Sequence, residues 1–387
     1  MSRLLEWSSQ HTPDTAVAHL DILPDTGLGQ AEAATLTADF TLNSAQRFQS
    51  PGWFAHMDPP TPWVTWITQA FTAAMNQNLL HPDTGEIGRL MDAKVVAALA
   101  PHFGMDGGHM VPGSTLANLT AIWAAREIAG VDVVVASELA HVSVAKAAHI
   151  LGLDYRAVPV NRAGHIDFEQ IGNTSSACLV LTAGTTSTGS VDPMLPFPEA
   201  AWVHVDAAWA GPLRLSQIHA SKLAGLDAAQ SVAVSAHKWF WQPKDSALIF
   251  FSDSEAAHEA LSFGGAYLAA PNVGLMGSSA ARAIPLAATL MAFGVQGIAQ
   301  RLDACMALAE RFAAHIDADP KFELWAPPET GVIAWRPVHS AVSDLRAKLA
   351  GQGYFVSQTK LDGQDWLRSV AVHPGIDVDA IYAAARS

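Results

Sequence analysis

A lysine flanked by apolar and aromatic residues is the first position in this sequence that could do covalent chemistry. Lys238 comes soon after the apolar run 231–234, and aromatic residues follow it directly. Burial lowers the pKa of a lysine, because water no longer stabilises the ammonium, and the neutral amine can then form a Schiff base with an aldehyde. An ordinary surface lysine at a turn is the alternative. Taken alone, the pair His237 and Lys238 does not decide between the two.

An aspartate at the end of another apolar run could act on the same ligand. Asp206 closes the run 202–205 and is followed by Ala207 and Ala208, which leave room for a flat ring. At the carboxyl edge of an α/β sheet, where ligands bind, an aspartate can keep a pyridine nitrogen protonated. Asp206 and Lys238 are about 30 residues apart, the length of one strand–helix–strand unit, so they can share one edge. A turn or a helix cap is the alternative role for Asp206.

Further polar positions suit a planar, phosphorylated ligand. Ser114 and Thr115 open a helical pattern, where free backbone N–H groups and hydroxyls would bind phosphate. His141 follows an apolar run and is suited to stacking on a ring, and a hydroxyl-rich loop containing Thr186 follows another run. The alternatives are helix capping, a structural histidine and a simple turn.

The elements that would position these residues form a regular alternation. From about residue 110, short apolar runs alternate with Ala-rich helical patterns, which predicts an α/β fold with a mainly parallel central sheet and helices on both faces. After a helical pattern over 283–317, the order strand, strand, helix, strand, helix predicts a small C-terminal α/β domain. The predicted central strands are 131–135, 178–182, 202–205, 231–234 and 247–251, and predicted helices include 116–128, 142–151 and 197–201.

The same patterns predict the domain organisation. Residues 1–60 contain one short helical pattern and a Pro-rich irregular stretch, and we expect them to form an N-terminal arm. Residues 61–290 would form the large domain that binds the ligand. Residues 291–387 would form the small C-terminal domain.

Composition excludes several classes of protein. The 387-residue chain has a formal net charge of −14, which disfavours binding to nucleic acid or to an anionic membrane surface. Charged residues make up only 15% of it, which argues for a large buried core. Two cysteines, Cys178 and Cys305, are too few for a disulfide scaffold and suit a reducing cytoplasm. No apolar run approaches the ~18 residues of a membrane span, and the N-terminus does not resemble a signal peptide.

The order of these segments along the chain is more specific than any one of them. From about residue 51 to residue 384, the chain resembles the pyridoxal-phosphate-dependent group II amino-acid decarboxylases, which include aromatic-amino-acid, glutamate and 2,4-diaminobutyrate decarboxylases. The resemblance implies fold type I, pyridoxal 5'-phosphate as cofactor and decarboxylation of an L-amino acid to the amine. It also implies a homodimer with active sites at the interface.

Roles for individual residues also follow from the resemblance. Lys238 would be the Schiff-base lysine and a proton carrier, and Asp206 would pair with the pyridine nitrogen. His141 would stack on the ring face opposite Ala208, which makes Lys238, Asp206 and His141 the catalytic set. The implied cofactor-binding residues are Ser114, Thr115, His141, Thr186, Asp206, Ala208, Ser235, His237 and Lys238.

Substrate contacts are implied at two further places. Arg368 lies in a segment that matches the one supplying a substrate-carboxylate arginine, and its alternative role is a solvated charge at a strand edge. Trp53, Phe54 and His56 lie in a segment that matches a lining of the substrate pocket.

The chain also departs from the family pattern. It is short, and the stretch 261–279 is brief where the family has a long loop carrying a proton-donating tyrosine. Tyr267 is the only tyrosine there. Three alternatives therefore stay open: decarboxylation-coupled oxidative deamination to an aldehyde, a lyase reaction, and a non-catalytic cofactor-binding homologue. A NAD-dependent dehydrogenase is disfavoured, because no Gly-rich dinucleotide turn is present.

Overall fold

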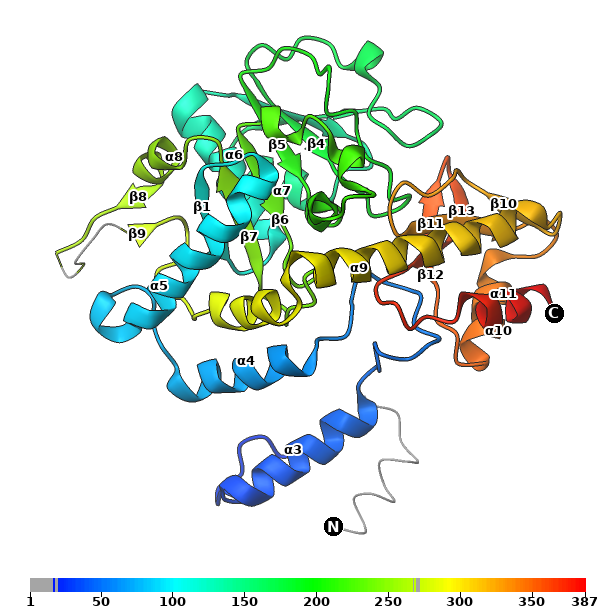
Figure 1. The fold of residues 1–387 in the computed structure, drawn as a ribbon, viewed down its shortest axis with the longest axis horizontal. Coiled ribbons are helices and arrows are strands. Elements are labelled where there is room, and N and C mark those ends of the chain that lie inside the picture. The colour runs from blue at the N-terminus through cyan, green and yellow to red at the C-terminus, as the bar shows by residue number, and fades with distance from the viewer. Residues whose placement is uncertain (1–16, 18–19, 267, 269–271) are drawn as a thin grey trace. The chain divides into compact units, whose positions relative to one another are not determined.

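The computed structural model describes residues 17, 20–266, 268 and 272–387 (Figure 1). The chain divides into two compact units, residues 1–48 and 49–387. In the first unit, helix α3 (Gln30–Ser44) has no buried residue. The second unit contains every described strand and every predicted site residue. Domain boundaries at residues 60 and 290 stay a prediction.

Seven strands form the central sheet, in the order β1–β7–β6–β5–β4–β2–β3. Pairing is parallel from β3 to β6, whereas β7 runs antiparallel to both β6 and β1. The predicted α/β fold with a mainly parallel sheet is therefore confirmed. Its strands are β1 (Gly107–Val111), β2 (Val133–Ser137), β3 (Asp154–Val158), β4 (Ala177–Thr182), β5 (Trp202–Asp206), β6 (Ser231–Val234) and β7 (Ala247–Phe251).

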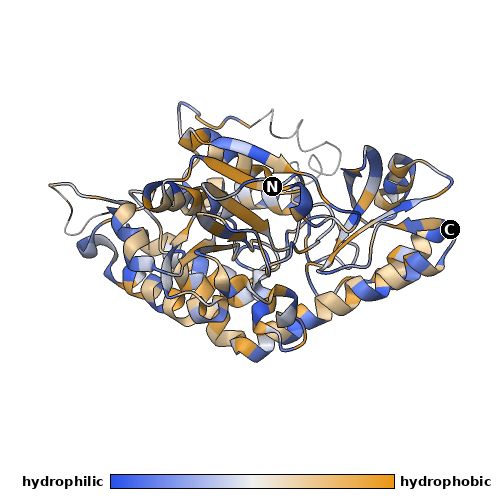
Figure 2. Cartoon of the chain, turned by 90° about the horizontal axis from the view of Figure 1, so that it is seen from above, coloured by the Kyte–Doolittle hydropathy of each residue, from blue (hydrophilic) through white to orange (hydrophobic). Residues whose placement is uncertain are grey.

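The middle strands are buried along their whole length. Every residue of β4, β5, β6 and β7 is buried, because helices and irregular segments cover the sheet. Figure 2 shows hydrophobic strands between helices of mixed hydropathy. The helices of this region are α4 (Trp63–Met75), α5 (Pro82–Leu99), α6 (Ser114–Ala129), α7 (Val142–Leu151) and α8 (Ser254–Ala260). Short 3₁₀ helices are η1 (Ala100–Phe103), η2 (Phe168–Gln170), η3 (Gly211–Leu215), η4 (Ala220–Leu223) and η5 (Leu226–Ala228), and a small hairpin joins β8 (Ser262–Phe263) to β9 (Asn272–Val273).

One predicted helix does not form. The segment 197–201, between β4 and β5, is irregular. Pro193, Pro196 and Pro198 lie in or just before it, and proline lacks the N–H donor that a helix interior requires. The apolar content of this segment serves packing rather than a helix.

A second sheet forms near the C-terminus, in the order β10–β11–β13–β12, with antiparallel pairing throughout. This confirms the predicted small sheet-containing region, although strand β12 was not predicted. Its elements are β10 (Phe322–Leu324), β11 (Val332–Pro337), α10 (Val342–Gly351), β12 (Ser357–Leu361), β13 (Gln364–Val370) and α11 (Val378–Arg386).

Residues 51–57, predicted as irregular chain of the N-terminal arm, are bonded to this C-terminal sheet. Phe54 N donates to Phe355 O at 3.0 Å, and Phe355 N donates to Gly52 O at 2.8 Å. Val370 N in turn donates to Phe54 O at 3.0 Å. Segment 51–57 therefore lies beside β13, the strand that carries Arg368.

Helix α9 (Ala283–Ala318) leads from the central sheet to the C-terminal sheet, with a kink at Gly294. By length and composition this helix could cross a membrane, whereas the sequence predicted no membrane span. A buried core helix meets the same criteria, and α9 buries Leu302, Met306 and Phe312 in its second half. Only 33% of its most apolar 18-residue window is buried in the single chain.

Gly108 lies in β1, close to the backbone of the paired strand β7. Its φ is +150°, and a Cβ there would lie 2.0 Å from Ile249 O. We expect Gly108→Ala to lower the free energy of unfolding by roughly 3 kcal/mol, because two backbones would have to separate. Gly130→Ala is the matched control: Gly130 has φ +64° and open space around it, so it should cost only ~1 kcal/mol. Urea unfolding followed by circular dichroism measures both, and equal losses would contradict the argument.

Candidate active site

The predicted cofactor residues converge at the carboxyl edge of the central sheet. Asp206 is the last residue of β5, Lys238 follows β6, and His141 precedes α7 after β2. The three groups are close enough to interact electrostatically, since Asp206 acts on both Lys238 and His141, and Lys238 acts on His141. The structure thus brings together groups that are far apart in the chain, at the edge where α/β proteins bind ligands.

The surroundings of Lys238 favour its neutral amine. Burial lowers the pKa of Lys238, because its ammonium loses water, and this outweighs the opposing effect of the Asp206 carboxylate. The nearby Lys244 lowers the pKa further. Trp239 and Phe240, which follow in the chain, are fully buried and make this region apolar. Lys238 therefore has the environment predicted for a nucleophilic amine.

Asp206 is held as a hydrogen-bond acceptor at both oxygens. Ala208 N donates to Oδ1 at 3.1 Å, and Asn118 Nδ2 donates to Oδ2 at 2.8 Å. Asp206 is only 4% exposed and Ala208 6%. Both oxygens therefore receive a donor, which fixes the orientation of the carboxylate beside the site.

His141 is placed by the start of helix α7. Its Nδ1 accepts from Ser143 N at 3.2 Å and lies 2.8 Å from Ser143 Oγ. Burial lowers the pKa of His141 despite the opposing charge of Asp206. The imidazole is therefore uncharged at neutral pH. His141 is only partly buried by its neighbours, and the residue as a whole is exposed in the single chain, as a stacking group needs to be.

The start of α6 presents hydrogen-bond donors that could bind a phosphate group. Gly113 precedes the helix with φ +91°, and no described side chain caps this end, so the first backbone N–H groups stay available. A Cβ on Gly113 would be 3.9 Å from His237 Cε1, which places the segment after β6 beside this helix start. Ser235 Oγ lies 3.1 Å from His237 Nε2. The predicted residues Ser114, Thr115, Ser235 and His237 therefore gather around one helix terminus.

An unpaired atom in this set tests whether a phosphate fits. His237 Nδ1 is buried and has no hydrogen-bond partner among the described residues. Burial lowers the pKa of His237 to about 4, with a further effect of Lys244, so the ring is neutral. A phosphate oxygen would supply the missing acceptor for an N–H at Nδ1. The residues present thus fit a phosphorylated cofactor.

Arg368 is a buried guanidinium that the described chain does not pair with a carboxylate. Nε donates to Ser357 Oγ at 2.9 Å, and Nη1 donates to Thr186 O at 3.1 Å. Nη2 donates to Ala55 O at 3.4 Å and to His56 Nδ1 at 3.1 Å. One N–H of Nη1 stays free of these contacts, so a planar donor and an uncompensated charge are available for an anion.

The predicted substrate contacts in segment 51–57 have different surroundings. His56 is exposed and accepts from Arg368 at Nδ1, and burial together with Arg368 lowers its pKa. Trp53 is 6% exposed, and its ring centroid lies 5.8 Å from that of His56. Phe54 is fully buried and packs edge-on against Phe312, with ring centroids 5.0 Å apart. The structure thus places His56 at the site and Phe54 in the core behind it.

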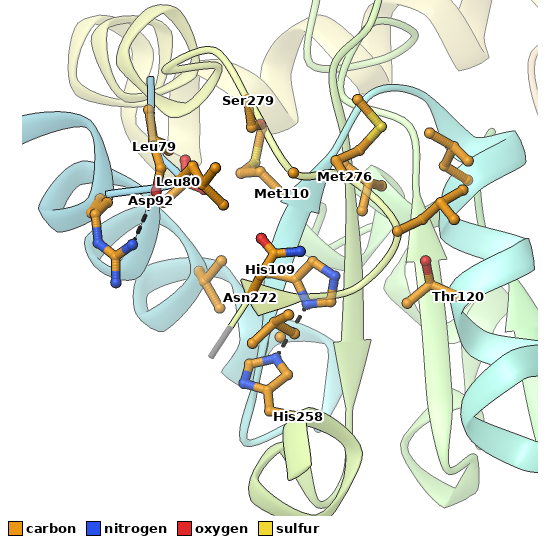
Figure 3. A pocket seen from close by; sticks show the side chains of 18 of the residues that line it. Leu79, Leu80, Asp92, His109, Met110, Thr120, His258, Asn272, Met276 and Ser279 are labelled. Carbon is orange, nitrogen blue, oxygen red and sulfur yellow. Dashed lines mark hydrogen bonds between the residues drawn. The ribbon is translucent and has the colours of Figure 1, made fainter. Parts of the chain in front are cut away.

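The stretch that carries Tyr267 cannot be fully placed, and the cavity next to it lies apart from the predicted site. Tyr267, the only tyrosine of the stretch 261–279, lies outside the described residues. A cavity of about 340 Å³ opens between α5, β1 and segment 272–279 (Figure 3). His109 and His258 are hydrogen bonded there at 3.2 Å, and burial raises the pKa of Asp92 to about 7. No predicted site residue lines this cavity, so the chemistry predicted from the sequence does not lie in it.

Three buried polar residues behind the site were not predicted. Asn118, Ser143 and His204 are nearly or fully buried and hydrogen bond to one another or to the predicted residues. Asparagine within the helical pattern 116–128 and histidine within the apolar run 202–205 are polar residues where apolar ones are expected. These polar residues within apolar patterns were the signal from which the buried network could have been predicted.

Comparison with known proteins identifies the family. A sequence profile described as the pyridoxal-dependent decarboxylase conserved domain matches residues 40–338. The L-2,4-diaminobutyrate decarboxylase of Rhizobium meliloti (strain 1021) is 28% identical over 411 residues, covering 94% of this chain and 82% of that protein. The corresponding enzyme of Acinetobacter baumannii is 24% identical over 421 residues, covering 92% and 82%. This chain belongs to the pyridoxal-dependent decarboxylase family.

Solved structures show the same fold. The glutamate decarboxylase domain of a Vibrio parahaemolyticus protein, described as diaminobutyrate-pyruvate transaminase and L-2,4-diaminobutyrate decarboxylase, gives a TM-score of 0.82 at 22% identity and covers 96% of this chain and 88% of that chain. The Oryza sativa TDC solved with PLP and tryptamine gives 0.86 at 19% identity and covers 100% and 94%. The protein is accordingly a pyridoxal-phosphate-dependent amino-acid decarboxylase, a carboxy-lyase, as the resemblance implied.

Proposed function

We propose that this protein releases the α-carboxyl group of an L-amino acid as carbon dioxide and returns the amine, with Lys238 as the cofactor lysine. One observation carries the proposal: a lysine of lowered pKa, a buried carboxylate and a buried arginine without an ion pair in the described chain meet at one sheet edge. Bound pyridoxal phosphate supplies an electron sink for the pair left at Cα when carbon dioxide departs.

The chain's own residues hold and orient the reactants. Asp206 would pair with the pyridine nitrogen, and its negative charge would keep that nitrogen protonated. His141 and Ala208 would contact the ring. Ser114, Thr115, Ser235 and His237 would hold the phosphate, and Thr186 would contribute to the cofactor site.

Lys238 and Arg368 act on the substrate. Lys238 would bind the cofactor aldehyde as the neutral amine. Once the substrate amine has taken its place, Lys238 Nζ would be free to hold a proton for Cα. Arg368 binds the α-carboxylate through the free N–H of Nη1 and orients it, with segment 51–57 beside it. The bond from Cα to the carboxylate carbon breaks, and one proton returned at Cα completes the amine.

A substrate panel tests this function. The amino acids are 2,4-diaminobutyrate, glutamate, aspartate, tyrosine and tryptophan, which cover the side chains named for the related enzymes. We expect one of them to give carbon dioxide and amine in equal amounts without hydrogen peroxide. Peroxide in proportion to carbon dioxide would show aldehyde formation instead, and absence of turnover across a widened panel would contradict the proposal.

We also propose a homodimer, because helix α4 leaves a large apolar surface uncovered. Trp63, Trp66, Phe71 and Met75 are 55–70% exposed in the single chain. Helix α4 packs on α9, whose Met291 is 77% exposed, so the apolar surface continues across both helices. Monomers rarely expose apolar surfaces of this kind, and a second copy of the chain is the partner that the family resemblance implies. The two buried free cysteines support our further proposal of a cytoplasmic location.

The double variant Trp66→Asp with Phe71→Asp is expected to dissociate the dimer. Large aromatic residues at the centre of an interface each contribute ~2 kcal/mol or more, so losing two of them should raise the dimer dissociation constant at least ~700-fold. Light scattering after size-exclusion chromatography measures the mass across a dilution series. Ile218→Asp, at an apolar residue outside α4 and α9 that is 68% exposed, is the matched control. A wild type that is monomeric at high concentration would disprove the dimer.

A further inference from the structure

A chain of buried hydrogen bonds runs behind Asp206 and His141, and it centres on Asn118. This side chain lies on α6 and is 1% exposed. Asn118 Nδ2 lies 2.8 Å from Asp206 Oδ2 and 2.9 Å from Ser143 Oγ. On its other side, Asn118 Oδ1 lies 3.1 Å from His204 Nε2. One amide therefore contacts Asp206 directly and His141 through Ser143.

Asp206 determines which way the Asn118 amide points. A carboxylate oxygen only accepts, so the group facing Asp206 Oδ2 must be the amide NH2. Its second hydrogen is then donated to Ser143 Oγ. The opposite orientation would place the amide oxygen 2.8 Å from a carboxylate oxygen, with no proton between them. Asn118 Oδ1 must consequently accept a hydrogen from His204 Nε2.

The orientation of Asn118 in turn fixes the proton on His204. With its proton on Nε2, His204 accepts at Nδ1 from Ser231 Oγ, 2.9 Å away. Ser231 Oγ itself accepts from Trp202 Nε1 at 2.9 Å. Burial lowers the pKa of His204 to about 4, so the ring is neutral as this arrangement requires. The other tautomer would donate to Ser231 O at 3.2 Å, but it would leave two lone pairs facing each other at Asn118.

On the other side, the same amide fixes the proton on His141. Ser143 Oγ accepts from Asn118, so its own hydrogen is free to be donated to His141 Nδ1 at 2.8 Å. Ser143 N donates to the same atom at 3.2 Å. His141 Nδ1 therefore carries no proton, and the neutral ring keeps its proton on Nε2.

We infer that Asn118 is a positioning residue that orients the Asp206 carboxylate and holds His141 as the Nε2–H tautomer at the same time. The inference rests on the proposed function, which makes Asp206 and His141 the groups that face the cofactor. The Trp202–Ser231–His204 series keeps the amide from turning over. The isosteric Asn118→Asp keeps the packing but places a second acceptor against Asp206, so it separates positioning from mere space filling.

Nitrogen-15 NMR of histidine-labelled, cofactor-free protein reads these protons directly. The variants His141→Gln and His204→Gln assign the two signals among the 16 histidines. In the wild type, both rings should be neutral with the proton on Nε2. Ser143→Ala should disturb the proton on His141 and leave that on His204 unchanged. Thr120→Val, a buried position on the same helix outside this network, is the matched control and should disturb neither.

Cofactor affinity gives the second readout. Titration of cofactor-free protein with pyridoxal phosphate should show at least ~10-fold weaker binding for Asn118→Asp, the effect of losing a hydrogen bond to a charged group. Wild-type affinity in that variant, or a proton on Nδ1 of either wild-type histidine, would overturn the inference. If Asn118→Asp does not fold, the inference is tested by Ser143→Ala, which should change the proton position on His141 and leave that on His204 unchanged. Failure of the wild type to bind the cofactor would refute the proposed function, while the histidine signals would still judge the network.

Discussion

Lys238→Ala is expected to abolish carbon dioxide release, by at least ~10⁴-fold, in a protein that stays folded. The loss is large because one atom, Nζ, serves first as the nucleophile and then as the proton carrier. The visible absorbance band of lysine-bound pyridoxal phosphate should be absent from the variant. Lys348→Ala, at an exposed lysine on α10, is the matched control and should keep both band and turnover.

Replacing Lys238 should also stabilise the cofactor-free protein. The pKa of Lys238 is lower in the folded chain than in the unfolded chain. Below the ordinary lysine pKa, folding therefore requires the protein either to bury an ammonium or to release a proton, and both cost free energy. We expect Lys238→Met to raise the free energy of unfolding at neutral pH, with a smaller gain at alkaline pH. An unchanged or lowered value at neutral pH would show that the amine is well solvated in the folded protein.

Arg368→Lys is expected to raise KM for the amino acid about 100-fold, although the charge is kept. A lysine has no planar fork, so it cannot bond to the protein at several points and still present a donor to a carboxylate. The lost contact to a charged group corresponds to roughly 1.5–3 kcal/mol. Steady-state kinetics gives KM, and cofactor titration shows whether the effect is confined to the substrate.

Arg336→Lys on the neighbouring strand β11 is the matched control for this substitution. Arg336 pairs with Glu323 on the adjacent β10 and is not part of the proposed site. It should leave KM unchanged. If Arg368→Lys also has a wild-type KM, the carboxylate is bound elsewhere, and Arg368 serves only to join segment 51–57 to the C-terminal sheet.

The sequence predicted the buried strands best. Strands β6 and β7 begin and end where the apolar runs 231–234 and 247–251 do, because strands covered on both faces are apolar throughout. Strands β1, β3 and β12 were missed, since each lies at or near a sheet edge and carries glycine or polar residues. The turn after β12 did carry a signal. Asp362 and Gly363 both have positive φ, as an Asp-Gly hairpin requires.

The sequence predicted those site residues that follow a strand, but not the contacts between distant segments. Lys238 and Asp206 were found because each follows an apolar run, and parallel strands bring their carboxyl ends to one edge. Contacts between distant segments had no such local signature. Nothing in the chain around Asn118 indicates that it meets Asp206, and nothing around His56 indicates that it meets Arg368. These contacts depend on the packing of whole elements, which apolar periodicity does not specify.

The anchoring of Arg368 also has a consequence for the order in which the protein is made. Strands β1 to β7 and Lys238 are all present once residue 251 has been synthesised. The carboxylate site proposed around Arg368, in contrast, joins segment 51–57, the loop at Thr186 and strands β12 and β13. Its last part is synthesised with β13. The residues proposed to hold the cofactor are therefore made well before the site proposed for the amino acid can be complete.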